Sequence, residues 1–284
     1  MGSTGRPRLV ATDLDGTVVR GDGTVSARTV AAFRRVAAAG SRIVLATGRP
    51  PRLMDEIADA FTAEAVAICS NGAMLYDLRR RRVTAVHAIA PDTVAEAVRR
   101  LRAAMPELGV AVEHARFLTA APDYEAGEWD RGADLVRVPA EELGLLPAPK
   151  LIARHPRLDA DRLLAAAAPL LDGLVTVYHS NGERLIEAIA PGVSKAAALA
   201  DCAAGLGITA AEVAAFGDMP NDLPMLDWAG TSYAVAGAHP QVLARADRVI
   251  GGNEEDGVAA VLEQLFADPS GAGAPPVPEA QVCP

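Results

Sequence analysis

Four short apolar segments, far apart along the chain, each end in a polar or glycine-rich stretch. They are residues 8–12, 42–46, 65–69 and 213–216, and helical patterns lie between them. This alternation predicts an α/β fold with a doubly wound parallel, Rossmann-like sheet. Open sheets of this kind bind ligands at the carboxyl edge of their strands. The four polar stretches are therefore expected to meet at one site.

The first polar stretch reads Asp13-Leu14-Asp15-Gly16-Thr17. In an extended segment, residues i and i+2 point the same way, so Asp13 and Asp15 can share one cavity. Close carboxylates repel each other, and they usually share a cation or divide the roles of acid and base. The simpler interpretation is a surface turn, because Asp and Gly are common turn residues.

The middle of the chain predicts an inserted α/β domain over residues 84–189, within a discontinuous core of residues 1–83 and 190–268. Its expected elements are strands at 83–89, 110–113, 150–154, 174–179 and 185–188, with helices at 92–105 and 159–171, arranged as two βαβ-like units. Residues 18–25 suggest a small hairpin flap beside the acids. The Pro- and Gly-rich tail, 269–284, is expected to be disordered.

Composition narrows the possible partners and the compartment. The formal net charge of -9 argues against nucleic acid or an anionic membrane as the main partner. No stretch resembles a signal peptide or a membrane span. The three cysteines are far apart and show neither a disulfide framework nor zinc spacing, which favours a reducing, cytoplasmic location.

Four motifs in order carry a family resemblance: the Asp13–Thr17 stretch, Thr47-Gly48-Arg49, Lys195, and Gly217-Asp218-x-x-Asn221-Asp222. Over residues 8–265 the chain resembles the haloacid dehalogenase-like phosphatases. It is most similar to their Cof-type branch, which has a large α/β cap between the second and third motifs. Further matches to that branch are Asn71-Gly72-Ala73, Val193-Ser194-Lys195 and Asp256-Gly257-Val258.

The resemblance implies a Mg²⁺-dependent phosphatase that acts on a small phosphorylated metabolite, such as a sugar phosphate or a cofactor-like phosphate. Asp13 would be the nucleophile that forms an aspartyl-phosphate, and Asp15 would move protons and ligate the metal through its backbone carbonyl. Asp218 would be the second metal acid. Ser194 is a plausible N-cap that places Lys195 in the first helical turn, where it would meet phosphate. The remaining phosphate contacts would come from Thr47, Gly48 and Asn221, and the supporting residues would be Gly16, Thr17, Arg49, Asn71, Gly72 and Asp222.

Other interpretations stay open at this point. Thr47-Gly48 is also typical of a strand-to-helix turn, Lys195 of a solvated helix lysine, and Asp222 of a helix cap. The same covalent chemistry would serve a phosphomutase or phosphotransferase, and a third alternative is a non-catalytic protein that binds a phosphometabolite. The cap is expected to select the leaving group and to exclude water.

Overall fold

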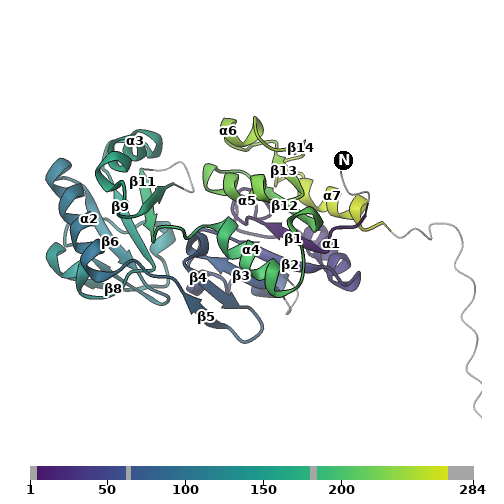
Figure 1. The fold of residues 1–284 in the computed structure, drawn as a ribbon, viewed down its shortest axis with the longest axis horizontal. Coiled ribbons are helices and arrows are strands. Elements are labelled where there is room, and N and C mark those ends of the chain that lie inside the picture. The colour runs from purple at the N-terminus through teal and green to yellow at the C-terminus, as the bar shows by residue number, and fades with distance from the viewer. Residues whose placement is uncertain (1–4, 62–64, 180–183, 268–284) are drawn as a thin grey trace, which may run out of the picture.

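A computed structural model describes residues 5–61, 65–179 and 184–267 of the 284-residue chain. These residues form two lobes, and each lobe is built around one β-sheet (Figure 1). The tail predicted at 269–284 lies outside the described residues.

The first sheet has eight strands in the order β14-β13-β12-β1-β2-β3-β4-β5. The six strands from β14 to β3 run parallel, whereas β4 and β5 are antiparallel to their neighbours. All parallel strands therefore end at one edge, as predicted. The bounds are β1 Leu9–Thr12, β2 Arg42–Ala46, β3 Val66–Cys69, β4 Met74–Asp77, β5 Arg82–Val86, β12 Val213–Gly217, β13 Thr231–Val235 and β14 Arg248–Ile250.

Helices cover both faces of this sheet, which confirms the doubly wound fold. The chain leaves β1 for β2 through α1 (Ala27–Ala38), and it leaves β12 for β13, in the opposite direction, through α5 (Leu223–Trp228). Right-handed crossovers in opposite directions place α1 and α5 on opposite faces. The helix α7 (Gly257–Leu265) packs against α1, and α4 (Lys195–Gly205) packs against α5. The short helix α6 (Pro240–Leu243) follows β13.

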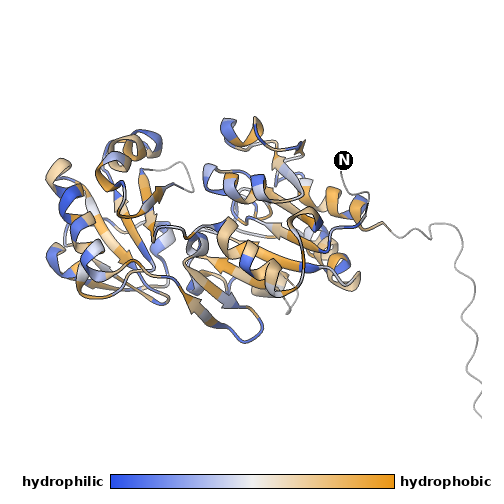
Figure 2. Ribbon diagram, in the orientation of Figure 1, coloured by the Kyte–Doolittle hydropathy of each residue, from blue (hydrophilic) through white to orange (hydrophobic). Residues whose placement is uncertain are grey.

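The second sheet forms the cap lobe, with six strands in the order β10-β11-β9-β6-β7-β8. Two helices, α2 (Pro91–Ala104) and α3 (Ala160–Leu171), pack their apolar stripes on one face of it. Because strand side chains alternate, every second residue points to the other face, where a smaller apolar cluster lies. Apolar residues concentrate in the strands of both lobes (Figure 2). The bounds are β6 Gly109–Glu113, β7 Phe117–Ala120, β8 Asp134–Arg137, β9 Lys150–Arg154, β10 Thr176–Tyr178 and β11 Leu185–Ile189.

Two local predictions were wrong, and one was right in part. The strand expected at 83–89, within the inserted domain, is β5, which pairs with β4 at the edge of the first sheet. The first expected βαβ-like unit is therefore divided between the two sheets. In the second unit, β9 and β10 run parallel to each other before and after α3, with β11 antiparallel between them. Residues 18–25 form a turn closed by the backbone of Arg20 and Thr24, without a paired hairpin. The domain limits stay a prediction; the chain crosses between the two sheets after β5 and again after β11.

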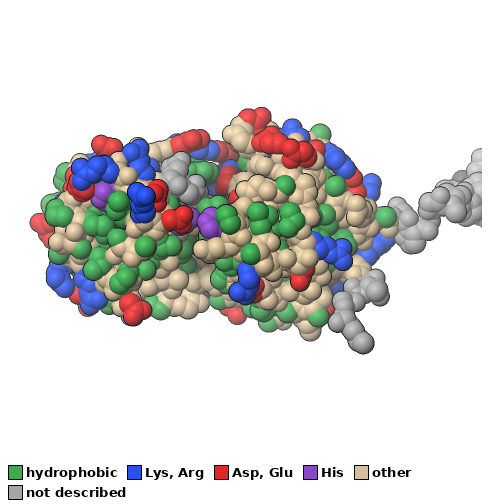
Figure 3. Space-filling view, turned by 90° about the horizontal axis from the view of Figure 1, so that it is seen from above, with side chains coloured by type: hydrophobic (Ala, Val, Ile, Leu, Met, Phe, Trp, Pro, Cys, Tyr) green, Lys and Arg blue, Asp and Glu red, His purple; other side chains and the backbone are tan. Residues whose placement is uncertain are grey.

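Two further features of the described residues are the lengths of the helices and the distribution of charge on the surface. The longest described helix, α2, has 14 residues, and a bilayer requires roughly 20, so none of the described helices could cross a membrane. On the face shown in Figure 3, acidic and basic side chains are interspersed over both lobes.

Candidate active site

The carboxyl edge of the first sheet gathers the predicted residues. Asp13 follows β1, Thr47 follows β2 and Asp218 follows β12, and these three strands are adjacent in the sheet. The register aligns Thr12 with Phe216, and the Asp13 backbone N–H donates to the Phe216 carbonyl at 2.9 Å. Strand pairing therefore brings together acids that are about two hundred residues apart in sequence.

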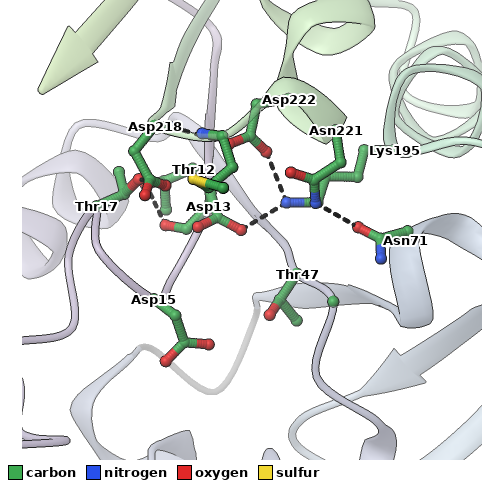
Figure 4. A network of polar contacts seen from close by, with 12 residues as sticks. Thr12, Asp13, Asp15, Thr17, Thr47, Asn71, Lys195, Asp218, Asn221 and Asp222 are labelled. Carbon is green, nitrogen blue, oxygen red and sulfur yellow. Dashed lines mark hydrogen bonds and ion pairs between the residues drawn. The ribbon is translucent and has the colours of Figure 1, made fainter. Parts of the chain in front are cut away.

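Lys195 links two of the acids at the centre of the site (Figure 4). Its Nζ lies 2.6 Å from Asp13 Oδ1 and 2.6 Å from Asp222 Oδ1, and all three side chains are buried. The Ser194 hydroxyl accepts from the Ala197 N–H at 3.0 Å, so Ser194 caps α4 and Lys195 is its first residue, as predicted. The alternative of a solvated lysine is wrong, because Lys195 is 1% exposed.

The charges at this centre interact strongly. Burial raises the pKa of Asp13 well above its usual value, the Lys195 ammonium opposes that shift, and the nearby carboxylates of Asp222 and Asp218 add to it. Burial alone would lower the pKa of Lys195, but the charges of Asp13 and Asp222 outweigh it and raise that pKa. Lys195 is therefore a cation, and its charge is the influence that favours the ionised form of Asp13 against burial and the neighbouring carboxylates.

Three carboxylates at this centre could hold a metal ion: ligand oxygens of Asp13, Asp218 and Asp222 lie within 4.8 Å of one another. Burial and the charge of Asp222 raise the pKa of Asp218 to about 7, while the Thr17 hydroxyl, which donates to it at 2.8 Å, works against that shift. An oxygen-only donor set with crowded negative charge fits a hard divalent cation such as Mg²⁺.

Asp222 has a different set of contacts from the other two acids. One of its oxygens meets Lys195, and the other accepts the backbone N–H groups of Asp218 and Met219, each at 3.0 Å. Its side chain therefore fixes the loop that carries Asp218, and it makes no side-chain cap bond to α5. Both of its oxygens have protein partners, so Asp13 and Asp218 are better placed as direct ligands.

Asp15 lies apart from this centre (Figure 4). Arg49 holds its carboxylate through two N–H groups, with Nε 2.7 Å from Asp15 Oδ2. Between the two acids, Gly16 has a φ of 82°, a conformation that favours glycine, and a Cβ there would collide with Asp218. The turn that separates the side chains of Asp13 and Asp15 thus favours a glycine at this position.

The remaining predicted residues surround the centre. The Thr47 hydroxyl accepts from the Arg49 N–H at 3.0 Å, and the Asn221 amide donates to Asn71 Oδ1 at 2.8 Å. Asn71 adopts a φ of 54° in a tight turn after β3. A Cβ on Gly72 would collide with the Ser194 backbone, so this glycine permits the turn to pack against the start of α4.

A cavity opens beside these residues and extends to the cap. It is lined from the core by Asp13, Asp15, Thr47, Gly48, Arg49, Pro50 and Asn221, and from the cap by Glu113, Tyr124, Trp129, Asp130, Lys150, Ile152, Arg154, Leu185 and Glu187. The sequence prediction missed all of these cap residues. One signal was present: Glu113, Lys150 and Glu187 are charged residues within otherwise apolar strands, where an unpaired charge would be costly.

This parallel sheet, the acids and lysine at its carboxyl edge, and the second sheet across the cavity define a Rossmann-like protein with an acidic site beneath a cap. The chain belongs to the haloacid dehalogenase-like hydrolase family, whose model matches residues 10–262. It is 30% identical to the HMP-PP phosphatase of Cronobacter sakazakii, over 92% of this chain and 97% of that protein. It is 25% identical to the 5-amino-6-(5-phospho-D-ribitylamino)uracil phosphatase YwtE of Bacillus subtilis, over 92% of this chain and 98% of that protein.

Solved structures of similar fold agree with this family assignment. The phosphatase BT1666 from Bacteroides thetaiotaomicron is 25% identical, with a TM-score of 0.76 over 90% of this chain and 94% of that one. The subclass IIB sugar phosphatase BT4131, 20% identical, shares the fold with a TM-score of 0.77 over 90% of this chain and 98% of that one. The chain is therefore a phosphatase of the haloacid dehalogenase type, as the sequence motifs predicted.

Proposed function

We propose that this phosphatase hydrolyses phosphate monoesters of small metabolites, such as sugar or cofactor-like phosphates, through an aspartyl-phosphate on Asp13. The observation that carries the proposal is the placement of Asp13, which lines the cavity and is held 2.6 Å from Lys195. The relatives' names support the substrate class, since YwtE acts on a phosphorylated ribitylamino compound and another relative, 25% identical, is the pyridoxal phosphate phosphatase YbhA of Escherichia coli.

Electrostatics explain why the nucleophile needs cations. An aspartate that approaches a phosphate dianion meets about 4 kcal/mol of repulsion for each charge pair at ~4 Å and an effective dielectric of ~20. Lys195 offsets part of this repulsion. Mg²⁺, held by Asp13, Asp218 and the Asp15 backbone carbonyl, would supply the remaining charge neutralisation.

Nucleophilic attack, proton transfer and phosphate binding are assigned to individual residues of the chain. An Asp13 oxygen attacks phosphorus as the ester P–O bond breaks, and Asp15 protonates the leaving oxygen. Asp15 then takes a proton from the water that attacks the aspartyl-phosphate, which releases phosphate and restores Asp13. Thr47, the Gly48 N–H and Asn221 orient the phosphate oxygens. Because Arg49 holds the Asp15 carboxylate in this structure, proton transfer requires Asp15 to turn away from Arg49.

The test uses phenyl phosphate with Mg²⁺ and with a chelator. We expect Asp13→Asn to lower kcat by at least about 10³-fold, and chelation to remove activity that added Mg²⁺ restores. The matched control is Asp201→Asn, an exposed acid on α4, which keeps wild-type turnover. Unchanged turnover in Asp13→Asn would contradict the mechanism. In ¹⁸O-labelled water, release of phenol without an equivalent amount of labelled phosphate would favour transfer to another acceptor.

A cytoplasmic location also belongs to this proposal. Cys69 and Cys202 are free thiols in the structure, and burial raises the pKa of Cys69, which makes it unreactive. Free thiols are typical of a reducing compartment.

A further inference from the structure

The inner face of the cap sheet carries three buried charged side chains that we call the cap triad: Glu113, Lys150 and Glu187. Lys150 Nζ lies 2.7 Å from Glu113 Oε2 and 2.6 Å from Glu187 Oε1, and each side chain is at most 5% exposed. The strand register sets Glu113 opposite Lys150, with Glu187 one strand further along. All three line the cavity that also contains Asp13.

Lys150 is surrounded by acceptors from the protein itself. Its ammonium donates to Glu187 Oε1 at 2.6 Å and to the Gly48 carbonyl at 3.1 Å, and Glu113 Oε2 lies 2.7 Å away as an ion-pair partner. Burial would lower the pKa of Lys150, but the two carboxylates outweigh it and raise that pKa, so it stays charged. The cap triad therefore presents acceptor oxygens to the cavity, because each carboxylate oxygen can accept more than one hydrogen bond.

The surrounding charges favour the same kind of ligand. Among the described cap residues that line the cavity, three are acids and two are bases: Glu113, Asp130 and Glu187 against Lys150 and Arg154. Arg154 interacts with the Tyr124 hydroxyl, which itself donates to Asp130 at 2.9 Å. Arg52 also lies 2.8 Å from Glu113, so the charges of the two triad carboxylates are balanced by two cations that they already bind. An anionic leaving group would thus meet carboxylates there, beside cations that are already paired with acids.

We propose that the cap triad selects phosphate monoesters whose leaving group offers hydroxyl or N–H donors and carries no further negative charge, of which a polyol is the simplest case. This inference rests on the proposed phosphatase function and adds its substrate class. Donors on the leaving group would bind the Glu113 and Glu187 oxygens while the phosphate lies at Asp13. Such charge-assisted hydrogen bonds contribute about 1.5–3 kcal/mol each.

A matched pair of substrates tests the proposal on the wild-type enzyme with Mg²⁺. Sorbitol 6-phosphate and 6-phosphogluconate have the same six-carbon length, but one ends in a hydroxymethyl group and the other in a carboxylate. We expect kcat/KM to be at least about tenfold higher for the polyol, since one such hydrogen bond corresponds to a factor of ten or more. Equal values, or a preference for the carboxylate, would overturn the inference.

Glu187→Gln and Glu113→Gln then test the residues themselves, with Glu142→Gln, an exposed cap acid, as the control. Both triad variants should reduce the preference for the polyol by about tenfold, and the control should keep it. A folded triad variant with the wild-type preference would overturn the inference. If the triad variants do not fold, the comparison of the two substrates on the wild-type enzyme decides the inference. Hydrolysis of phenyl phosphate tests the chemistry separately, because a wild-type enzyme that does not hydrolyse phenyl phosphate would refute the proposed function itself.

Discussion

Each lobe buries one lysine between two carboxylates, and the two clusters do different work. In the core, Lys195 bridges Asp13 and Asp222; in the cap, Lys150 bridges Glu113 and Glu187. The contact distances are nearly the same, from 2.6 to 2.7 Å. The geometry of a lysine between two acids therefore does not by itself define a role.

The charge balance distinguishes the two clusters. Asp218 adds a third acid to the core cluster, so the ionised group carries an excess of negative charge that a divalent cation can neutralise. In the cap cluster, Arg52 lies 2.8 Å from Glu113 and supplies a second cation, so the charges balance within the protein. The first arrangement suits metal and phosphate, and the second suits a neutral ligand with hydrogen-bond donors.

Removing each lysine gives the largest expected contrast. Lys195→Met should lower kcat on phenyl phosphate by about 10³-fold, because ~4 kcal/mol of charge neutralisation beside the nucleophile is lost. Lys150→Met should affect phenyl phosphate much less and sorbitol 6-phosphate more. Steady-state kinetics at saturating Mg²⁺ measure both effects.

Both lysine variants leave buried carboxylates without their partner, at a cost of about 3–5 kcal/mol. Circular dichroism therefore has to establish a temperature at which each variant is folded before kinetics are compared. Equal losses of kcat on phenyl phosphate in the two folded variants would remove the distinction between the clusters.

Two glycines with similar backbone conformations provide a contrast with a smaller expected effect, because alanine should affect Mg²⁺ binding at only one of them. Gly16 and Gly23 have φ values of 82° and 81°, but a Cβ collides with Asp218 at Gly16 and meets nothing within 4 Å at Gly23. Alanine at either position costs about 1 kcal/mol of backbone strain. Only Gly16→Ala should also weaken Mg²⁺ affinity, by roughly tenfold, as measured by calorimetry. Similar affinities in the two variants would mean that Asp218 is not a ligand.

The effect that bears least directly on activity is a pH dependence of stability without metal. The pKa of Asp218 is raised from 3.8 to about 7 in the folded state, so the folded protein binds its proton more tightly than the unfolded chain does. Its contribution to stability is complete below pH 3.8 and is lost as the pH rises through about 7. Between pH 5 and pH 8 the free energy of unfolding should fall by at most a few kcal/mol, and Mg²⁺ should reduce that fall. Denaturant titrations without Mg²⁺ that show a rise instead would contradict this assignment.

The same contrast explains what the sequence could predict. The core residues lie in short motifs at the ends of strands or at the start of a helix, and each motif is contiguous in the sequence. Asp13, Asp15, Lys195 and Asp218 could therefore be predicted as site residues from the sequence alone. The cap residues stand inside strands and acquire meaning only through their pairing. Glu113, Lys150 and Glu187 come from three strands, and the sequence did not predict that these strands pair side by side. The role of Asp222 as a loop anchor likewise depends on backbone N–H groups that no sequence pattern reveals.

The central claim is that the Asp13 carboxylate attacks phosphorus. Acid quenching during turnover of phenyl phosphate, followed by peptide mass spectrometry, tests it directly. The account predicts one added phosphoryl group on the peptide that contains Asp13, which is acid-stable enough to detect and is lost in Asp13→Asn. A phosphoryl group on another residue, or turnover that persists in Asp13→Asn, would contradict the account.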